Sequence, residues 1–169
     1  MHPTGGLSGG QFERGGKKEY FVFEVPGRPK GKGRPRASAV QGHARMRTPA
    51  ETVQYENWIR LCYQQRYGAQ RFAPPVVLEI NAYFEIPKSY TKKKRELCAQ
   101  GLVRPTCKPD IDNVVKAVAD GLNGVAYKDD SGIVEIRCAK RWGSPERLVV
   151  RISGDLETSS EDMEELYHG

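Results

Sequence analysis

The stretch VVLEINAYFEI, residues 76–86, decides the fold class because its apolar residues alternate with more polar ones. Alternation at every second position is typical of a β-strand that has one face in the core and the other nearer to water. Pro87 ends the pattern. We therefore expect a long strand here, with the other elements assembled around it.

The segments on both sides of this strand supply the rest of the fold. Short runs rich in β-branched or aromatic residues predict strands, and apolar residues at three- and four-residue spacing predict helices. The predicted strands are residues 20–26, 133–139 and 148–152, and the predicted helices are residues 49–67, 92–100 and 113–122. Strands and helices mix without a regular βαβ repeat, so we expect an α+β fold, a mixed sheet of about four strands with helices packed on it.

Composition excludes several classes of protein. The chain has 169 residues, of which 38% are hydrophobic, so it suits one ordinary domain and is not disordered throughout. No apolar run is long enough to span a membrane, and no secretory signal follows Met1, so we expect a cytoplasmic protein without a membrane partner. Cys62, Cys98, Cys107 and Cys138 lack CxxC spacing, which predicts reduced, mostly buried thiols.

The distribution of charge separates a basic domain from two tails. Residues 1–19 are rich in Gly and predict a flexible tail, and residues 155–169 carry six acids and no Lys or Arg, which predicts a flexible acidic tail. The domain between them, residues 20–154, keeps 24 of the 27 bases and 13 of the 21 acids, a net charge of +11. Such an excess favours a polyanionic partner, and nucleic acid is the commonest one.

Two basic segments are candidates for binding phosphates. The segment RPKGKGRPR places Arg28, Lys30, Lys32, Arg34 and Arg36 at every second position between Gly and Pro, which excludes a helix and predicts a mobile loop. An ordinary disordered basic linker would give the same pattern.

The second basic segment opens the helix predicted at residues 92–100. Lys92, Lys93, Lys94 and Arg95 fall in its first turn, where positive charge opposes the helix dipole. This placement indicates phosphate contacts, or simply a solvated start of the helix. Contacts of this kind are independent of sequence and weaken steeply with salt.

A cluster of acids stands out in this basic chain, within KPDIDNVVKAVADGLNGVAYKDD, residues 108–130. Asp110 and Asp112 lie two apart, so an extended backbone would point both carboxylates to one side. Asp112 is also a candidate N-cap of the next helix, and Lys116 and Asp120 follow on the same helix face at intervals of four.

These acids have a structural and a chemical interpretation. The structural one is a cap, a solvated neighbour and a turn at Asp129-Asp130. The chemical one is a magnesium site, because Mg²⁺ prefers oxygen ligands. A protein that only holds nucleic acid gains nothing from carboxylates facing phosphate, whereas a metal-dependent nuclease requires them.

The order of these residues resembles the core of the RusA family of Holliday-junction resolvases. That core has D-x-D-N-x-x-K at the start of a helix, D-x-L further along it, then an aromatic residue and a D-D pair before a strand that ends in basic residues. The matching residues are Asp110, Asp112, Asn113, Lys116, Asp120, Leu122, Tyr127, Asp129 and Asp130. The resemblance covers residues 20–153 and includes the basic segment near the start.

The resemblance implies a homodimeric, Mg²⁺-dependent endonuclease that cuts branched DNA such as a four-way junction, with Mn²⁺ as a possible substitute for Mg²⁺. Asp110, Asp112 and Asp130 match the metal-binding carboxylates, and Lys116 matches the catalytic lysine. A shift of one residue would put Asp129 in place of Asp130, so that choice stays open here.

Two other functions are compatible with parts of the sequence. A non-catalytic, structure-specific DNA-binding protein accounts for the basic charge but not for the acids. An enzyme that holds a metal-bound nucleotide sugar through Asp110 and Asp112 accounts for the acids but not for the charge of +11.

Overall fold

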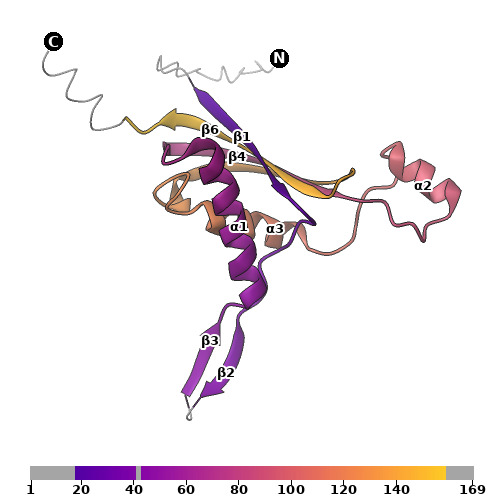
Figure 1. Ribbon diagram of the computed structural model, residues 1–169, viewed down its shortest axis with the longest axis horizontal. Helices are drawn as coiled ribbons and strands as arrows, with labels where there is room; N and C mark the ends of the chain where they lie inside the picture. Colours follow the sequence, from indigo (N-terminus) through magenta and orange to yellow (C-terminus); the bar gives the residue numbers. More distant parts are fainter. Residues whose placement is uncertain (1–17, 41–42, 159–169) are drawn as a thin grey trace, which may run out of the picture.

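A four-stranded mixed sheet organises the structure, a computed structural model that describes residues 18–40 and 43–158 (Figure 1). Its central strand β4 (Phe72–Phe84) pairs antiparallel with β6 (Arg147–Leu156) and parallel with β5 (Ile133–Trp142). The strand β1 (Glu19–Pro26) pairs antiparallel with β6, which gives the order β1-β6-β4-β5. The predicted α+β fold is confirmed.

The long predicted strand forms as its alternation requires. Val76, Leu78, Ile80, Ala82 and Phe84 are fully buried, and the residues between them are only partly buried. The strand ends at Phe84, two residues earlier than the sequence pattern suggested. One face of the sheet therefore carries the core.

Two helices complete that core. The helix α1 (Ala50–Tyr67) contacts β1, and α3 (Ile111–Leu122) lies against α1 and β5. Gly121 allows close packing of the helices, since a Cβ there would lie 3.1 Å from the carbonyl oxygen of Glu56 and 3.2 Å from the Cβ of Ile59. A short 3₁₀ turn, η1 (Asp130–Gly132), leads from the loop after α3 into β5.

Two parts of the chain extend away from the sheet. The helix α2 (Lys92–Ala99) lies at one end of the molecule, on the path from β4 to α3 (Figure 1). The hairpin of β2 (Arg36–Val40) and β3 (His43–Arg47) extends from the start of α1 (Figure 1). The sequence predicted α2 but not the hairpin. The side chain of Thr91 caps α2 by accepting a hydrogen bond from the backbone N–H of Lys94.

The structure corrects two local expectations at the start of α3. Asp110, not Asp112, occupies the N-cap position of α3, so Asp112 lies in the first helical turn. The two aspartates are therefore not presented from one extended segment. In α1, Pro49 takes the cap position, and the side chain of Thr52 accepts a hydrogen bond from the backbone N–H of Gly33 at 2.9 Å.

The basic segment near the start is packed rather than mobile. The backbone N–H of Lys32 donates to the carbonyl of Asn113 at 2.9 Å, and Pro29 is buried. Gly31 is needed for this approach, because a Cβ there would lie 2.8 Å from the Cβ of Asn113 and 2.9 Å from that of Pro109. Residues 29–33 thus form a strap between the starts of α1 and α3.

Most of the predicted tails, at residues 1–19 and 155–169, lies outside the described residues. Of the parts that are described, Glu19 begins β1 and Leu156 ends β6. All four cysteines are free, with Cys62 and Cys98 buried. In the described part of the chain, no helix combines the length and the apolar character needed to cross a membrane.

Truncating Ile59 tests the packing of α1 on the core. This side chain has no exposed surface, whereas Leu61, two residues on, is 44% exposed. Ile59→Ala is expected to lower the free energy of unfolding by about 2–5 kcal/mol, because it removes buried methyl groups and leaves a cavity. Leu61→Ala, the matched control, should change it by about 0.5 kcal/mol or less. Urea unfolding at one protein concentration measures both, and equal losses would contradict the packing described.

Candidate active site

A groove of about 710 Å³ lies between α3 and β5. It combines three carboxylates, those of Asp112, Asp130 and Glu135, and the ammonium group of Lys116 with an apolar wall. Part of this wall is open to solvent, since Val134 is 67% exposed. On α3, the groove is lined by Ile111, Asp112, Val115, Lys116 and Ala119. On η1 and β5, it is lined by Asp130, Ile133, Val134, Glu135, Ile136 and Cys138. Three of the four predicted catalytic residues therefore share one surface.

The return of the chain after α3 brings Asp130 to this groove. Gly124 adopts a positive φ of 75°, and its N–H donates to the carbonyl of Tyr127 at 2.9 Å. The hydroxyl of Tyr127, which is buried, donates to the carbonyl of Ala119 at 2.8 Å. This bond ties the loop back to α3 just before the aspartate pair, so the position of Asp130 relative to α3 is fixed.

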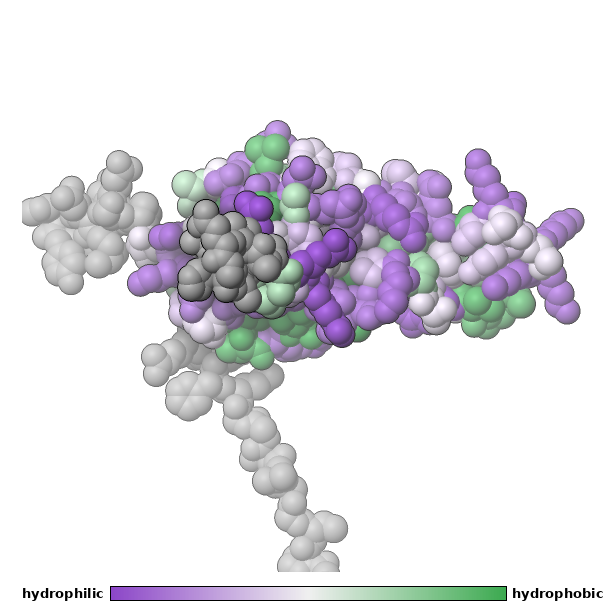
Figure 2. All heavy atoms as spheres, turned by 90° about the horizontal axis from the view of Figure 1, so that it is seen from below, coloured by the Kyte–Doolittle hydropathy of each residue, from purple (hydrophilic) through white to green (hydrophobic). Residues whose placement is uncertain are grey.

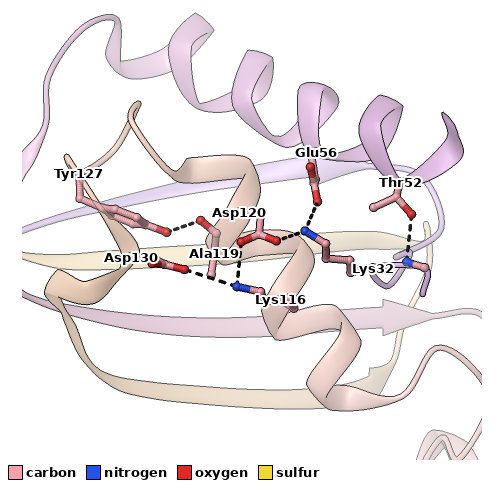
Figure 3. A network of polar contacts seen from close by, with 9 residues as sticks. Lys32, Thr52, Glu56, Lys116, Ala119, Asp120, Tyr127 and Asp130 are labelled. Carbon is pink, nitrogen blue, oxygen red and sulfur yellow. Dashed lines mark hydrogen bonds and ion pairs between the residues drawn. The ribbon is translucent and has the colours of Figure 1, made fainter. Parts of the chain in front are cut away.

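The ammonium group of Lys116 lies between two carboxylates. Its Nζ is 3.0 Å from Oδ1 of Asp120, one turn further along α3, and 3.5 Å from Oδ2 of Asp130 (Figure 3). The hydrogen bond to Asp120 is the main reason that the pKa of Lys116 is raised, and Asp130 adds to it. Lys116 is therefore charged at neutral pH.

Asp120 is shared by two lysines. Its Oδ2 accepts a hydrogen bond from Lys32 of the strap, and Lys32 also lies 3.4 Å from Glu56 of α1 (Figure 3). Burial alone would raise the pKa of Asp120, but the hydrogen bonds from Lys32 and Lys116 outweigh it and lower the pKa. The carboxylate thus stays ionised between two cations.

The structure separates the two members of the aspartate pair. Asp130 lines the groove with Lys116, whereas Asp129 lines a different cavity, beside Lys128 and Ser131. The Oγ of Ser131 donates to Asp129 at 2.6 Å, which is the main reason that the pKa of Asp129 is lowered. Of the two alternatives that the sequence left open, the geometry favours Asp130.

Asp110 lies at the start of α3 and does not line the groove. Its Oδ1 accepts a hydrogen bond from Lys108 at 2.5 Å, and this bond lowers the pKa of Asp110. Lys140 of β5 fixes the same segment by donating to the carbonyls of Cys107 and Pro109. The sequence indicated basic residues at the end of this strand but not their hydrogen-bonding role.

The oxygen donors of the groove fit a hard divalent cation. Asp112 and Asp130 line the same surface, and Mg²⁺ is commonly held by one or two protein carboxylates with water and substrate phosphate completing its shell. Within the described residues, no three His, Cys, Asp or Glu side chains converge on one point. Two of the three predicted ligands therefore share the groove, with Asp110 at the start of the same helix.

The predicted phosphate-binding residues of the first basic segment have unequal surroundings. Lys32 points inward to Asp120 and Glu56, and its side chain is 27% exposed. Arg28 pairs with Glu146 at 2.6 Å. Lys30, Arg34 and Arg36 are exposed. The three exposed side chains are open to a ligand, and that of Lys32 is committed to the protein itself.

The second basic segment is open along its whole length. Lys92, Lys93, Lys94 and Arg95 are all exposed on α2, and the ammonium group of Lys94 lies 3.7 Å from the ring centre of Tyr90. Hydrophilic side chains project from the end of the molecule that carries α2 (Figure 2). This end is a positively charged surface separate from the groove.

Comparison with known proteins agrees with this site. A family model described as endodeoxyribonuclease RusA matches residues 26–153, which include the groove, the strap and α2. The chain belongs to the RusA endodeoxyribonuclease family. It is also 39% identical over 136 residues to the Bacillus subtilis (strain 168) protein named "Uncharacterized protein YqaN", a match that covers 79% of this chain and 96% of that protein. The motif-based assignment to the RusA family is confirmed, and with it the nuclease class.

The hydrogen bond from Lys108 predicts a measurable shift at Asp110. In the wild type, without divalent metal, the Asp110 carboxyl should titrate below 3.8, and Lys108→Met should raise its pKa because the hydrogen bond and a nearby positive charge are lost. Carboxyl ¹³C NMR titration measures both values. Lys128→Met, which removes an exposed lysine after α3, is the control. An unchanged Asp110 pKa in Lys108→Met would contradict the contact.

Proposed function

We propose that this protein is a Mg²⁺-dependent endonuclease that resolves Holliday junctions and related branched DNA by paired, symmetric nicks. The observation that carries the proposal is the position of Lys116 beside Asp130, in the groove that Asp112 also lines. Membership of an endodeoxyribonuclease family supports the reaction class. A role in DNA recombination and repair in the cytoplasm of a bacterial or phage-infected cell follows from the substrate.

The residues of the groove have different proposed roles in the reaction. Asp112 and Asp130, together with Asp110 at the start of α3, would hold the metal ion, and Mn²⁺ has the same preference for oxygen ligands. When bound, the ion supplies positive charge at the phosphate and lowers the pKa of a bound water. Lys116 offers a second positive charge to the scissile phosphate, where negative charge grows in the transition state.

The symmetry of the substrate supports a homodimer. A four-way junction is two-fold symmetric and must be cut on two strands to be resolved. A protein with one groove per chain provides two equivalent grooves when it forms a two-fold dimer. Each groove would then cut one strand.

The exposed bases would hold the DNA outside the groove. Lys92, Lys93, Lys94 and Arg95 on α2 suit the backbone of one arm of the junction, and Lys30, Arg34 and Arg36 suit a second contact nearer to α3. Contacts to phosphate position the substrate without reading its sequence. The acidic groove therefore does not have to attract DNA by itself.

Replacing single aspartates of the groove with asparagine, which removes the negative charge but keeps the shape, tests the catalytic assignment. With Mg²⁺, the wild type should cut a synthetic four-way junction in preference to a fork or a linear duplex. Asp112→Asn and Asp130→Asn are each expected to lower the cleavage rate by about 10²-fold or more, because each removes an anionic ligand of the metal ion that stabilises the transition state. Both should still bind the junction. Asp129→Asn is the matched control and should keep the rate within about threefold, since its carboxylate lies outside the groove.

The products of the same reaction test pairing. On a cruciform plasmid, paired nicks convert the circle to a linear product, whereas unpaired nicks leave open circles. Loss of cleavage in Asp129→Asn but not in Asp130→Asn would contradict the assignment. If the wild type cuts no DNA with Mg²⁺ or Mn²⁺ yet binds junctions tightly, the non-catalytic DNA-binding alternative replaces the enzyme.

Removing charge from α2 tests the DNA-binding surface. The double variant Lys92→Ala and Lys93→Ala should bind junctions more weakly and should reduce the slope of log K against log salt by about 1.8, if each lysine contacts one phosphate. Arg66→Ala, at the far end of α1, is the control and should leave the slope unchanged. Fluorescence anisotropy over a range of salt concentrations measures this. An unchanged slope in the α2 variant would remove α2 from the binding surface.

A further inference from the structure

We propose that Lys32 and Asp120 are positioning residues for Lys116 rather than contacts to DNA. Lys32 belongs to the strap at residues 29–33 and binds Asp120, and Asp120 in turn binds Lys116 in the groove. The strap thereby holds Lys116 in place. The inference rests on the proposed function of Lys116. It concerns Lys32, which is half-buried, whereas the other bases of the RPKGKGRPR segment are exposed.

Lys32 is held at both ends along α3. Its backbone N–H donates to the carbonyl of Asn113, and its ammonium group binds the carboxylate of Asp120, two turns further along the same helix. Its ammonium group also lies 3.4 Å from Glu56 of α1. The side chain thus bridges the two helices, and its ammonium group is paired with protein carboxylates rather than left open for a phosphate.

The neighbouring glycines fix the strap in this position. A Cβ at Gly33 would lie 3.0 Å from Pro49 and from Oγ1 of Thr52, which itself accepts the hydrogen bond from the N–H of Gly33. Gly31 is confined in the same way against α3. The alternation of Gly with Lys in this segment therefore reflects close packing as well as charge.

Asp120 transmits this constraint to the groove. Its two oxygens have separate partners, Oδ2 with Lys32 and Oδ1 with Lys116, so rotation of the carboxylate would break both ion pairs. The side chain of Lys116 is half-exposed, and Asp130, 3.5 Å away, is its second anchor. Asp112 and Glu135 line the same groove. Without Lys32, Asp120 is free to turn and Lys116 loses its defined position.

The position of a charge matters for the reaction more than for binding. A shift of about 1 Å in a catalytic group costs on the order of 10²-fold in rate. Loss of a group that only positions Lys116 should therefore lower kcat with little change in KM. Loss of a phosphate contact should instead weaken binding and reduce its salt dependence.

The test compares two lysines of the same segment. Lys32→Met is expected to lower kcat for junction cleavage by about 10- to 100-fold, with an unchanged KM and an unchanged salt slope of binding. Lys30→Met, which removes an exposed charge two residues away, should weaken binding and reduce the slope by about 0.9. Lys32→Arg, which keeps the charge, should restore part of kcat.

A double-mutant cycle tests whether the two residues act as one unit. Asp120→Asn should lower kcat to a similar degree, and adding Lys32→Met to it should cost less than the product of the two single losses. Circular dichroism at the assay temperature confirms that each variant is folded. Additive losses in kcat, or a Lys32→Met variant with wild-type kcat and weaker binding, would overturn the inference.

A measurement independent of cleavage separates this inference from the proposed function. NMR relaxation at the Cε of Lys116 reports the order of its side chain, which should fall in Lys32→Met and in Asp120→Asn but not in Lys30→Met. If the wild type does not cut DNA, this result still decides the positioning role. If the wild type cuts DNA and the order of Lys116 is unchanged in both variants, the positioning role fails while the nuclease stands.

Discussion

The burial of one side of α3 is the constraint on which the rest of the site depends. Val114, Val118 and Leu122 face the core, so the opposite side of the helix must carry its polar residues outward. That side presents Lys116 to η1 and Asp120 to the strap. A helix rotated by one residue would lose its core and its ion pairs together, which couples the stability of the fold to the geometry of the groove.

Local patterns in the sequence were sufficient for most of the fold. The alternation over residues 76–86 predicted β4, and the three predicted helices match α1, α2 and α3 within a few residues of their ends. The hairpin of β2 and β3 was missed because its strands pair only with each other and carry no strong apolar alternation. The parallel pairing of β4 with β5 depends on contacts across the whole crossover, which no local pattern contains.

The sequence predicted those residues of the candidate site that belong to a recognisable motif. It did not predict the arrangements that depend on tertiary packing. The D-x-D-N-x-x-K pattern led to Asp112 and Lys116, but the choice of Asp130 over Asp129 needed the conformation of the loop after α3. Lys32 was grouped with its neighbours as a phosphate contact, because the spacing of charges along the sequence does not show where each side chain points. Only the contacts with Asn113 and Asp120 reveal that its side chain points inward.

The central claim is that Asp112 and Asp130 meet in one groove as metal ligands beside Lys116. The position of a bound divalent ion tests this claim most directly. Crystals soaked in Mn²⁺ give an anomalous signal that locates the ion independently of the protein phases. The account predicts a peak in the groove, about 2.2 Å from oxygens of both carboxylates, close to the spacing usual for small divalent ions. A peak beside Asp129, or one that touches neither Asp112 nor Asp130, would contradict it.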